Sequence, residues 1–167
     1  MSRILVTLTI NGARHEIECE PQRTLLEILR DELGLLGVKQ SCVQARCGVC
    51  TVLLDGKAVN SCILFALQCE GRGITTIEGV GEPHDLHPIQ AAFVAHGAVQ
   101  CGHCSPAMVL TAKSFLDRNP GMKPSRKEIR EALAGTLCRC TGYQKLVDAV
   151  AAAAAEMSRE SRNAAVE

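Results

Sequence analysis

This chain of 167 residues contains few aromatic side chains and carries no formal net charge. The chain has no Trp, one Tyr and three Phe, which leaves no aromatic platform on which nucleic-acid bases could stack. Its 18 basic and 18 acidic side chains cancel, so the basic face that a nucleic-acid partner requires is also missing. The composition argues against nucleic-acid binding and predicts a core of Leu, Ile, Val and Ala.

Long hydrophobic runs are missing as well. The first ten residues alternate polar and apolar side chains, which is unlike a signal peptide, and no twin-Arg export signal is present. The run Ala149–Ala155 is too short to span a membrane. We therefore expect a cytoplasmic protein, in which ten cysteines are more often metal ligands than disulfides.

The first half of the chain has the pattern of a mixed sheet crossed by one helix. Two hairpins are predicted around Asn11-Gly12 and Asp55-Gly56, and Thr24 with Glu27 has the spacing of a capping box at a helix start. A further strand is expected over Gly73–Glu78. We place this domain at residues 1–79 and a Gly- and Pro-containing linker at 80–86.

Strand patterns vanish after the linker, and four helix starts follow. They are expected at Pro88, at Ser105-Pro106, at the capping box of Ser125 with Glu128, and near Tyr143. Short connections between the helices favour a compact bundle. We place this domain at residues 87–157, followed by a polar tail at 158–167, and the fold class is α+β.

Eight of the ten cysteines form two sets of four. The first set has the spacing C-x4-C-x2-C with a distal fourth cysteine, which is the plant-type [2Fe–2S] ferredoxin pattern. Gly48, between two of the ligands, would let the backbone approach the cluster. A structural zinc site is the alternative, although zinc ligands usually come as short C-x2–4-C pairs. This set consists of Cys42, Cys47, Cys50 and Cys62.

The second set is ambiguous when it is considered alone. Its two close pairs, C-x2-C and C-x-C, each lie beside a predicted helix end, and helix N-termini favour an anionic cluster. C-x2-C also occurs in redox pairs and zinc sites. This set consists of Cys101, Cys104, Cys138 and Cys140.

Taken together, the two sets resemble a known family. The motifs GVKQSCVQARCGVCTV, Asn60-Ser61-Cys62, VQCGHCSPAM and GTLCRCTGY are similar to those of the small two-cluster subunit of the molybdenum hydroxylases, which include xanthine dehydrogenase, aldehyde oxidoreductase and carbon monoxide dehydrogenase. The resemblance runs from about Ile4 to Ala155. It implies a β-grasp ferredoxin-like domain followed by a four-helix domain.

The resemblance also implies a function as an electron-transfer subunit of an oxidoreductase, with the oxidation itself on another chain. A large subunit would hold a molybdopterin cytosine dinucleotide, approached by Gln100 and Cys140. Electrons would pass through the Cys101-led cluster and then the Cys42-led cluster, towards FAD on a medium subunit. The substrate, the final electron acceptor and the stoichiometry are not predicted by this sequence.

The chain departs from the family pattern at three positions. Relatives usually carry glycine where this chain has Ser41 and Ala45, and Ala45 at positive φ would cost about 1 kcal/mol. Ser41 could raise the potential of the first cluster by placing a hydroxyl near a sulfide, or the loop could tolerate both Ser41 and Ala45 without effect. His103 replaces an aromatic residue and either fills the same space or couples electron to proton transfer.

Two alternative functions remain open at this point. The chain could be a binding module stabilised by zinc, or a free-standing ferredoxin with two clusters. Metal analysis and the presence of a large partner would separate them. The two remaining cysteines, Cys19 and Cys69, are expected to be small buried hydrophobic residues.

Overall fold

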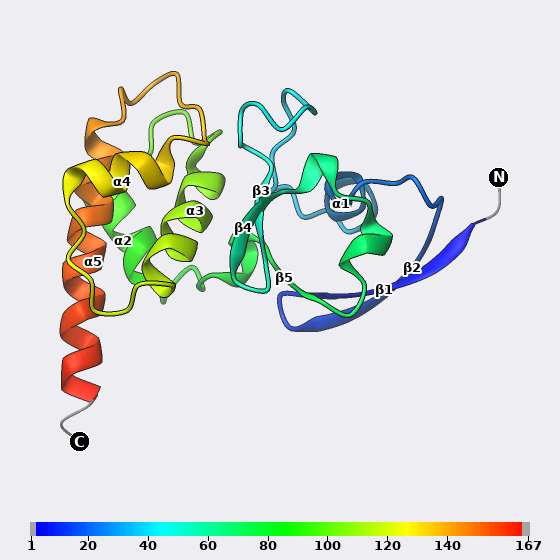
Figure 1. Ribbon diagram of the computed structural model, residues 1–167, viewed down its shortest axis with the longest axis horizontal. Coiled ribbons are helices and arrows are strands. Elements are labelled where there is room, and N and C mark those ends of the chain that lie inside the picture. Colours follow the sequence, from blue (N-terminus) through cyan, green and yellow to red (C-terminus); the bar gives the residue numbers. More distant parts are fainter. Residues whose placement is uncertain (1–2, 165–167) are drawn as a thin grey trace.

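A computed structural model describes residues 3–164 of the chain, with side chains described up to Arg159. Figure 1 shows a sheet with short helices on one side of the molecule and the longer helices on the other. The α+β class predicted from the sequence is confirmed. None of the described helices is both long enough and apolar enough to cross a membrane.

The sheet has five strands in the order β2-β1-β5-β3-β4. The central pair, β1 with β5, is parallel, and the other neighbours are antiparallel, so the sheet is mixed as predicted. Alternate residues of β1 face the core, with Val6, Leu8 and Ile10 each at most 2% exposed. The strands are β1 (Ile4–Ile10), β2 (Ala13–Cys19), β3 (Thr51–Leu54), β4 (Lys57–Asn60) and β5 (Gly73–Thr75).

Both predicted hairpins are confirmed, each with a two-residue turn. Asn11 and Gly12 have φ values of +49° and +82°, and Asp55 and Gly56 have +49° and +76°. Positive φ at both central residues is the requirement of the tight turns that match the twist of paired strands. The expected strand over Gly73–Glu78 is shorter than predicted, because it ends at Thr75 and the chain turns into the 3-10 helix η4 (Ile77–Gly79).

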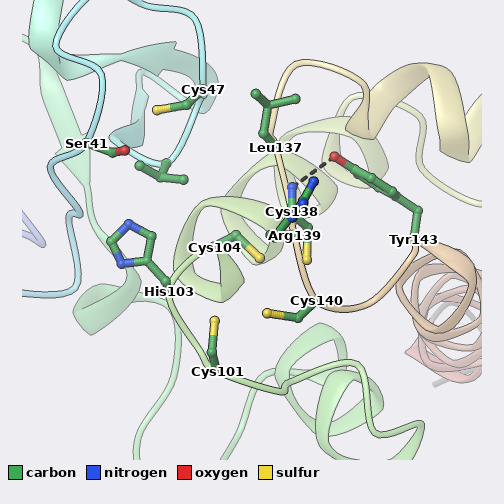
Figure 2. A pocket seen from close by; sticks show the side chains of 11 residues that line it. Ser41, Cys47, Cys101, His103, Cys104, Leu137, Cys138, Arg139, Cys140 and Tyr143 are labelled. Atoms are coloured by element: carbon green, nitrogen blue, oxygen red, sulfur yellow. Dashed lines mark hydrogen bonds between the residues drawn. The ribbon is translucent and has the colours of Figure 1, made fainter.

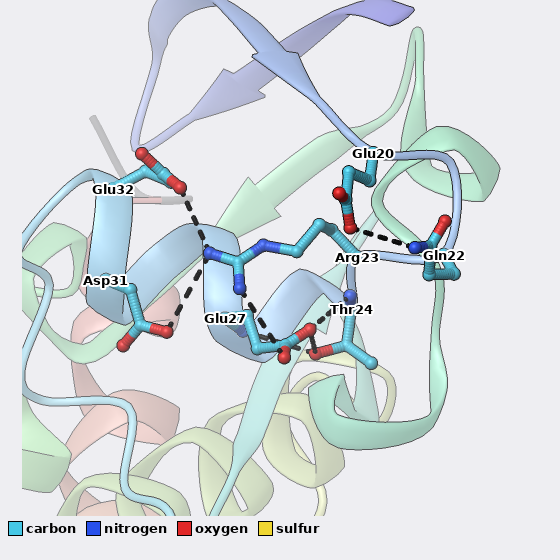
Figure 3. A network of polar contacts seen from close by, with 7 residues as sticks. All are labelled: Glu20, Gln22, Arg23, Thr24, Glu27, Asp31 and Glu32. Atoms are coloured by element: carbon cyan, nitrogen blue, oxygen red, sulfur yellow. Dashed lines mark hydrogen bonds and ion pairs between the residues drawn. The ribbon is translucent and has the colours of Figure 1, made fainter. Parts of the chain in front are cut away.

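The capping box of the first half is formed as predicted. The Thr24 hydroxyl accepts from the backbone N–H of Glu27 at 3.3 Å, and the Glu27 carboxylate accepts from the Thr24 N–H at 2.8 Å. Arg23 extends this network to the carboxylate of Glu32 at 3.0 Å, and the hydrogen bonds from Thr24 lower the pKa of Glu27 (Figure 3). The α-helix itself is short, since α1 (Leu25–Glu27) passes into the π-helix η1 (Ile28–Glu32).

Four helices make up the second half, and each begins within a residue of its predicted start. They pack around a second hydrophobic core that includes Phe93, Met108 and Ile129, each at most 1% exposed. They are α2 (Pro88–Ala95), α3 (Ser105–Asp117), α4 (Arg126–Leu133) and α5 (Gln144–Ala164). Residues 158–164 continue α5, so the expected tail is helical there, and residues 165–167 lie outside the described part.

The two halves meet along α3, which contacts the β3–β4 hairpin. Ser114 on α3 is fully buried, and its hydroxyl donates to the carbonyl of Gly56 and accepts from the N–H of Ala58. Val49, from the first half, is part of the second hydrophobic core. The segment that carries the first cysteine set therefore lies directly against the helical half.

Candidate metal centres

The β3–β4 hairpin brings together two members of the first cysteine set. Cys50 precedes β3, and Cys62 follows β4 within the short helix η2 (Ser61–Ile63). Thr51 pairs with Asn60 at the open end of the hairpin, so the two cysteines lie side by side. Burial, with a smaller contribution from the neighbouring Cys62 thiol, raises the pKa of Cys50 to about 11.

The other two members, Cys42 and Cys47, lie in the loop before β3. The Cys42 sulfur accepts hydrogen bonds from the backbone N–H groups of Gln44 (3.4 Å), Arg46 (3.3 Å) and Cys47 (3.4 Å). These donors lower the pKa of Cys42 to about 6, because they favour the thiolate. The same loop geometry would stabilise the negative charge of a bound iron–sulfur cluster.

This loop winds tightly around the Cys42 sulfur. Val43, Ala45 and Gly48 have φ values of +53°, +54° and +70°. Ala45 therefore has the positive φ that was considered from the sequence, a conformation that is strained for residues with a side chain. Ser41, the other position where relatives carry glycine, is not among the residues with positive φ.

The second cysteine set lines one cavity of about 510 Å³. Cys101 and Cys104 come from the segment before α3, and Cys138 and Cys140 from the loop between α4 and α5. Figure 2 shows the four sulfur atoms directed towards a common space. The fold therefore brings together two pairs that are 33 residues apart in the sequence, as predicted.

Within this cavity the thiols are paired across the two sequence motifs. The Cys104 thiol interacts with that of Cys138, and the Cys101 thiol with that of Cys140. Burial, with a contribution from Cys138, raises the pKa of Cys104 to about 12, and the hydrogen bond with Cys101 raises the pKa of Cys140. The stronger interactions between thiols therefore cross the two motifs, and weaker ones join cysteines of the same motif.

Two side chains next to the C-x-C motif hold its loop in place. The Tyr143 hydroxyl accepts from the N–H of Cys138 at 2.9 Å and donates to the carbonyl of Thr136 at 3.3 Å. Burial alone would raise the pKa of Cys138, but hydrogen bonds from the hydroxyl and N–H of Thr141 outweigh it and lower the pKa. The sequence analysis did not assign these roles, although both residues lie within the motif GTLCRCTGY.

The two candidate sites touch through their backbones. The N–H of Leu137, next to Cys138, donates to the carbonyl of Cys47 at 2.8 Å. A Cβ atom on Gly48 would lie 2.2 Å from the carbonyl oxygen of Gly135. Gly48 therefore lies directly against the helical half of the chain, and both this contact and its positive φ favour glycine.

Several other residues highlighted by the sequence lie near the second set. Ser41, His103 and Arg139 are exposed and line its cavity, whereas Gln100 is exposed next to Cys101. Ser41 also directly precedes Cys42 in the chain, so the expected effect of its hydroxyl on the first cluster stays a prediction. Cys19 and Cys69 are at most 4% exposed, as expected for small hydrophobic residues.

Both cysteine sets have the donor chemistry of a two-iron cluster. A [2Fe–2S] cluster takes four thiolates distributed over two iron atoms, and each set supplies four thiols. Both sets therefore fit this cofactor in their donor chemistry.

Comparison with known proteins supports this assignment over most of the chain. Residues 8–74 match the model of a 2Fe-2S iron-sulfur cluster binding domain, and residues 76–151 match that of a [2Fe-2S] binding domain. The small FeS subunit of nicotinate dehydrogenase from Eubacterium barkeri is 45% identical over 150 residues, covering 90% of this chain and 94% of that subunit. This chain belongs to the family of small [2Fe–2S] subunits of the molybdenum hydroxylases.

Solved structures of this small-subunit family share the whole fold. A chain of quinoline 2-oxidoreductase from Pseudomonas putida 86 has a TM-score of 0.89 and 42% identity, covering 96% of this chain and 98% of that one. Some relatives are much longer. Aldehyde oxidoreductase from Megalodesulfovibrio gigas is 47% identical over 151 residues, but this small subunit spans only 16% of its length.

Proposed function

We propose that this chain carries single electrons from a molybdopterin site on a large subunit, through two [2Fe–2S] clusters, towards a flavin subunit or another acceptor. The observation that carries the proposal is the presence of two separate sets of four thiols, one of them lining a single cavity. The bound clusters would supply the one-electron chemistry, and the chain's own residues would hold and connect them.

The thiol pairs of the structure suggest how each site divides its ligands between two iron atoms. In the first site, Cys42 with Cys47 would bind one iron atom and Cys50 with Cys62 the other. In the second site, the pairs would be Cys101 with Cys140 and Cys104 with Cys138. Each iron of the second site would then bind one cysteine from each motif, so neither motif could hold an iron atom alone.

The exposure of the second set supports its place next to the large subunit. Cys101, Cys140 and Gln100 are exposed, as is Leu137 at 56%. A cluster with exposed ligands next to apolar side chains is suited to a covering partner. Gln100 and Cys140 would face the molybdopterin cytosine dinucleotide held by that partner.

The first set would come second in the sequence of electron transfer. Cys47 lines the second cavity and accepts the hydrogen bond from Leu137, which supports transfer between the two clusters. Exposed Ile63 and Phe65 follow Cys62, and they offer an apolar surface at which an FAD-carrying subunit or another acceptor could dock.

We also propose a division of the chain into two domains and a linker. A β-grasp ferredoxin-like domain at residues 1–79 and a four-helix bundle at 87–157, with a linker at 80–86, agree with the mixed sheet and with helices α2 to α5. We also propose a cytoplasmic location. The names of the relatives refer to nicotinate, quinoline and aldehydes, so substrate specificity is proposed to lie on another chain.

Metal analysis of the purified chain tests the proposal. We expect on the order of four iron and four acid-labile sulfide per chain, and two distinct paramagnetic signals on reduction. Cys50→Ala and Cys104→Ala should each retain about two iron atoms and lose a different one of the signals. Mainly zinc in the freshly purified chain, or loss of both signals from either variant, would contradict the assignment.

The role in a complex needs a separate measurement. The intact assembly should contain a large molybdopterin-binding subunit and should reduce both clusters when its substrate is added. A chain that purifies from native extract without a large partner would instead support a free-standing ferredoxin.

A further inference from the structure

A single buried hydroxyl joins the two halves of the molecule away from the cysteine sites. Ser114 on α3 has no exposed surface. Its hydroxyl donates to the carbonyl of Gly56 at 2.8 Å and accepts from the N–H of Ala58 at 3.1 Å. Gly56 lies in the turn of the β3–β4 hairpin and Ala58 is the second residue of β4, so one side chain holds this end of the hairpin against the helix.

The elements joined by Ser114 both lead to cysteines of the candidate sites. Helix α3 begins at Ser105, immediately after Cys104. The hairpin begins immediately after Cys50 and ends two residues before Cys62. A movement of α3 relative to the hairpin would therefore move one site relative to the other.

The second point of attachment between the halves lies at the sites themselves. There Gly48 packs against Gly135, and the Leu137 N–H donates to the Cys47 carbonyl. Between these two points, α3 packs along the β3–β4 hairpin, and Val49 packs in the second hydrophobic core. The hydrogen bonds of Ser114 therefore fix the end of this interface that lies farther from the cysteine sites.

We propose that Ser114 is a positioning residue that fixes the separation and orientation of the two cluster sites. The inference rests on the proposed function and adds a role for a residue that binds neither cluster. The step it serves is the transfer of one electron, in which one ferrous iron of the second cluster becomes ferric and one ferric iron of the first becomes ferrous. No bond forms or breaks, so the rate depends on the distance and orientation that the protein maintains.

The test compares Ser114→Ala with Thr111→Val in the full chain loaded with both clusters. Thr111 lies one turn earlier on α3 and lines a cavity with residues of the hairpin, so its valine variant removes a hydroxyl without touching the Ser114 contacts. Both clusters are reduced with dithionite, and their magnetic dipolar coupling is measured by pulsed electron paramagnetic resonance. Iron content and the midpoint potential of each cluster are measured on the same samples.

We expect Ser114→Ala to broaden the distribution of distances between the clusters, while iron content and both potentials stay at the wild-type values. Electron exchange between the clusters should slow several-fold, and Thr111→Val should behave like the wild type. A distance distribution in Ser114→Ala as narrow as that of the wild type would overturn the inference. So would loss of iron from Ser114→Ala, because Ser114 would then be needed to form a site and not to position it.

The same measurements separate this inference from the proposed function. Wild-type protein with two clusters and a narrow distance distribution supports the function, whatever Ser114→Ala shows. Wild-type protein without two clusters would refute the function itself.

Discussion

The two cysteine sites hold the same donor atoms but are built in different ways. The first is contained in one segment of 21 residues, Cys42–Cys62, where a strained loop and a hairpin supply all four thiols. The second draws on two distant segments and depends on the packing of helices α3 to α5. The spacing of the first set was sufficient to identify it, whereas the second set needed the family motifs, and only the fold shows how its two distant pairs converge (Figure 2).

The two sites also differ in the groups that favour or disfavour the thiolate form of their cysteines. Three backbone N–H groups surround the Cys42 sulfur and favour its thiolate. In the second site, burial disfavours the thiolate of Cys104, and side-chain groups of Thr141 and Tyr143 support the loop around Cys138. Burial also disfavours the thiolate of Cys50 in the first site. The sites therefore differ mainly in the support of Cys42, which comes chiefly from backbone N–H groups, and of Cys138, to which the Thr141 hydroxyl also contributes.

Gly48→Ala should have the largest effect, because it disturbs the joint that the two sites share. The variant combines a positive φ with a Cβ 2.2 Å from the Gly135 oxygen. We expect a loss of roughly 2–4 kcal/mol in the free energy of unfolding, measured by chemical denaturation. Gly71→Ala is the matched control, since Gly71 has φ +74° and nothing within 4 Å of an added Cβ.

The control should lose only about 1 kcal/mol, which is the cost of positive φ alone. If Gly48→Ala and Gly71→Ala lose the same amount, then contact with Gly135 contributes nothing, and the two sites are not joined as the structure indicates.

Tyr143→Phe should have an intermediate effect and should act on the second site only. The variant removes the hydroxyl that accepts from the Cys138 N–H and donates to the Thr136 carbonyl. We expect a loss of about 1 kcal/mol in the free energy of unfolding. In a redox titration, the midpoint of the second cluster should shift while that of the first stays constant. A shift of both midpoints would argue against separate support for the two sites.

Ala45→Gly should have the smallest effect and should act on the first site. Glycine removes the strain at φ +54° but has more freedom in the unfolded chain, so we expect a net gain of about 0.5 kcal/mol in the free energy of unfolding. Ser41→Gly relieves no such strain and should lose about 0.5 kcal/mol. Chemical denaturation of both variants would support this interpretation if the free energy of unfolding rises in Ala45→Gly and falls in Ser41→Gly. An equal loss in the two variants would contradict it.

Ser41→Gly also tests whether the Ser41 hydroxyl affects the midpoint potential of the first cluster. Ser41 precedes Cys42 in the chain, but its side chain lines the cavity of the second set. We expect the midpoint potential of the first cluster to be the same with serine or glycine at this position.

Local chemistry explains what could be predicted from the sequence. Both hairpin turns and both capping boxes follow from residues a few positions apart, and the structure confirms each of them. The π-helix at Ile28–Glu32 and the extension of α5 to Ala164 were not predicted, because neither has a distinct signal in composition or spacing.

The candidate sites follow the same rule. The grouping of the thiols followed from spacing in the first set and from family motifs in the second. The pairing of Cys104 with Cys138, and the contact of Gly48 with Gly135, depend on segments about 34 and 87 residues apart. Long-range packing determines such contacts, and sequence patterns alone do not encode them locally.

The contact between Gly48 and Gly135 restricts the first residue but not the second, and this affects the exchange of halves between relatives. An added Cβ on Gly48 collides with Gly135, but an added Cβ on Gly135 meets nothing within 4 Å. Chimaeras that join the first half of this chain to the second half of a relative should therefore tolerate any small residue at position 135. Chimaeras that join the first half of a relative to the second half of this chain should fold only when that first half carries glycine at position 48. The residue at position 48 therefore predicts which halves can be combined within the family.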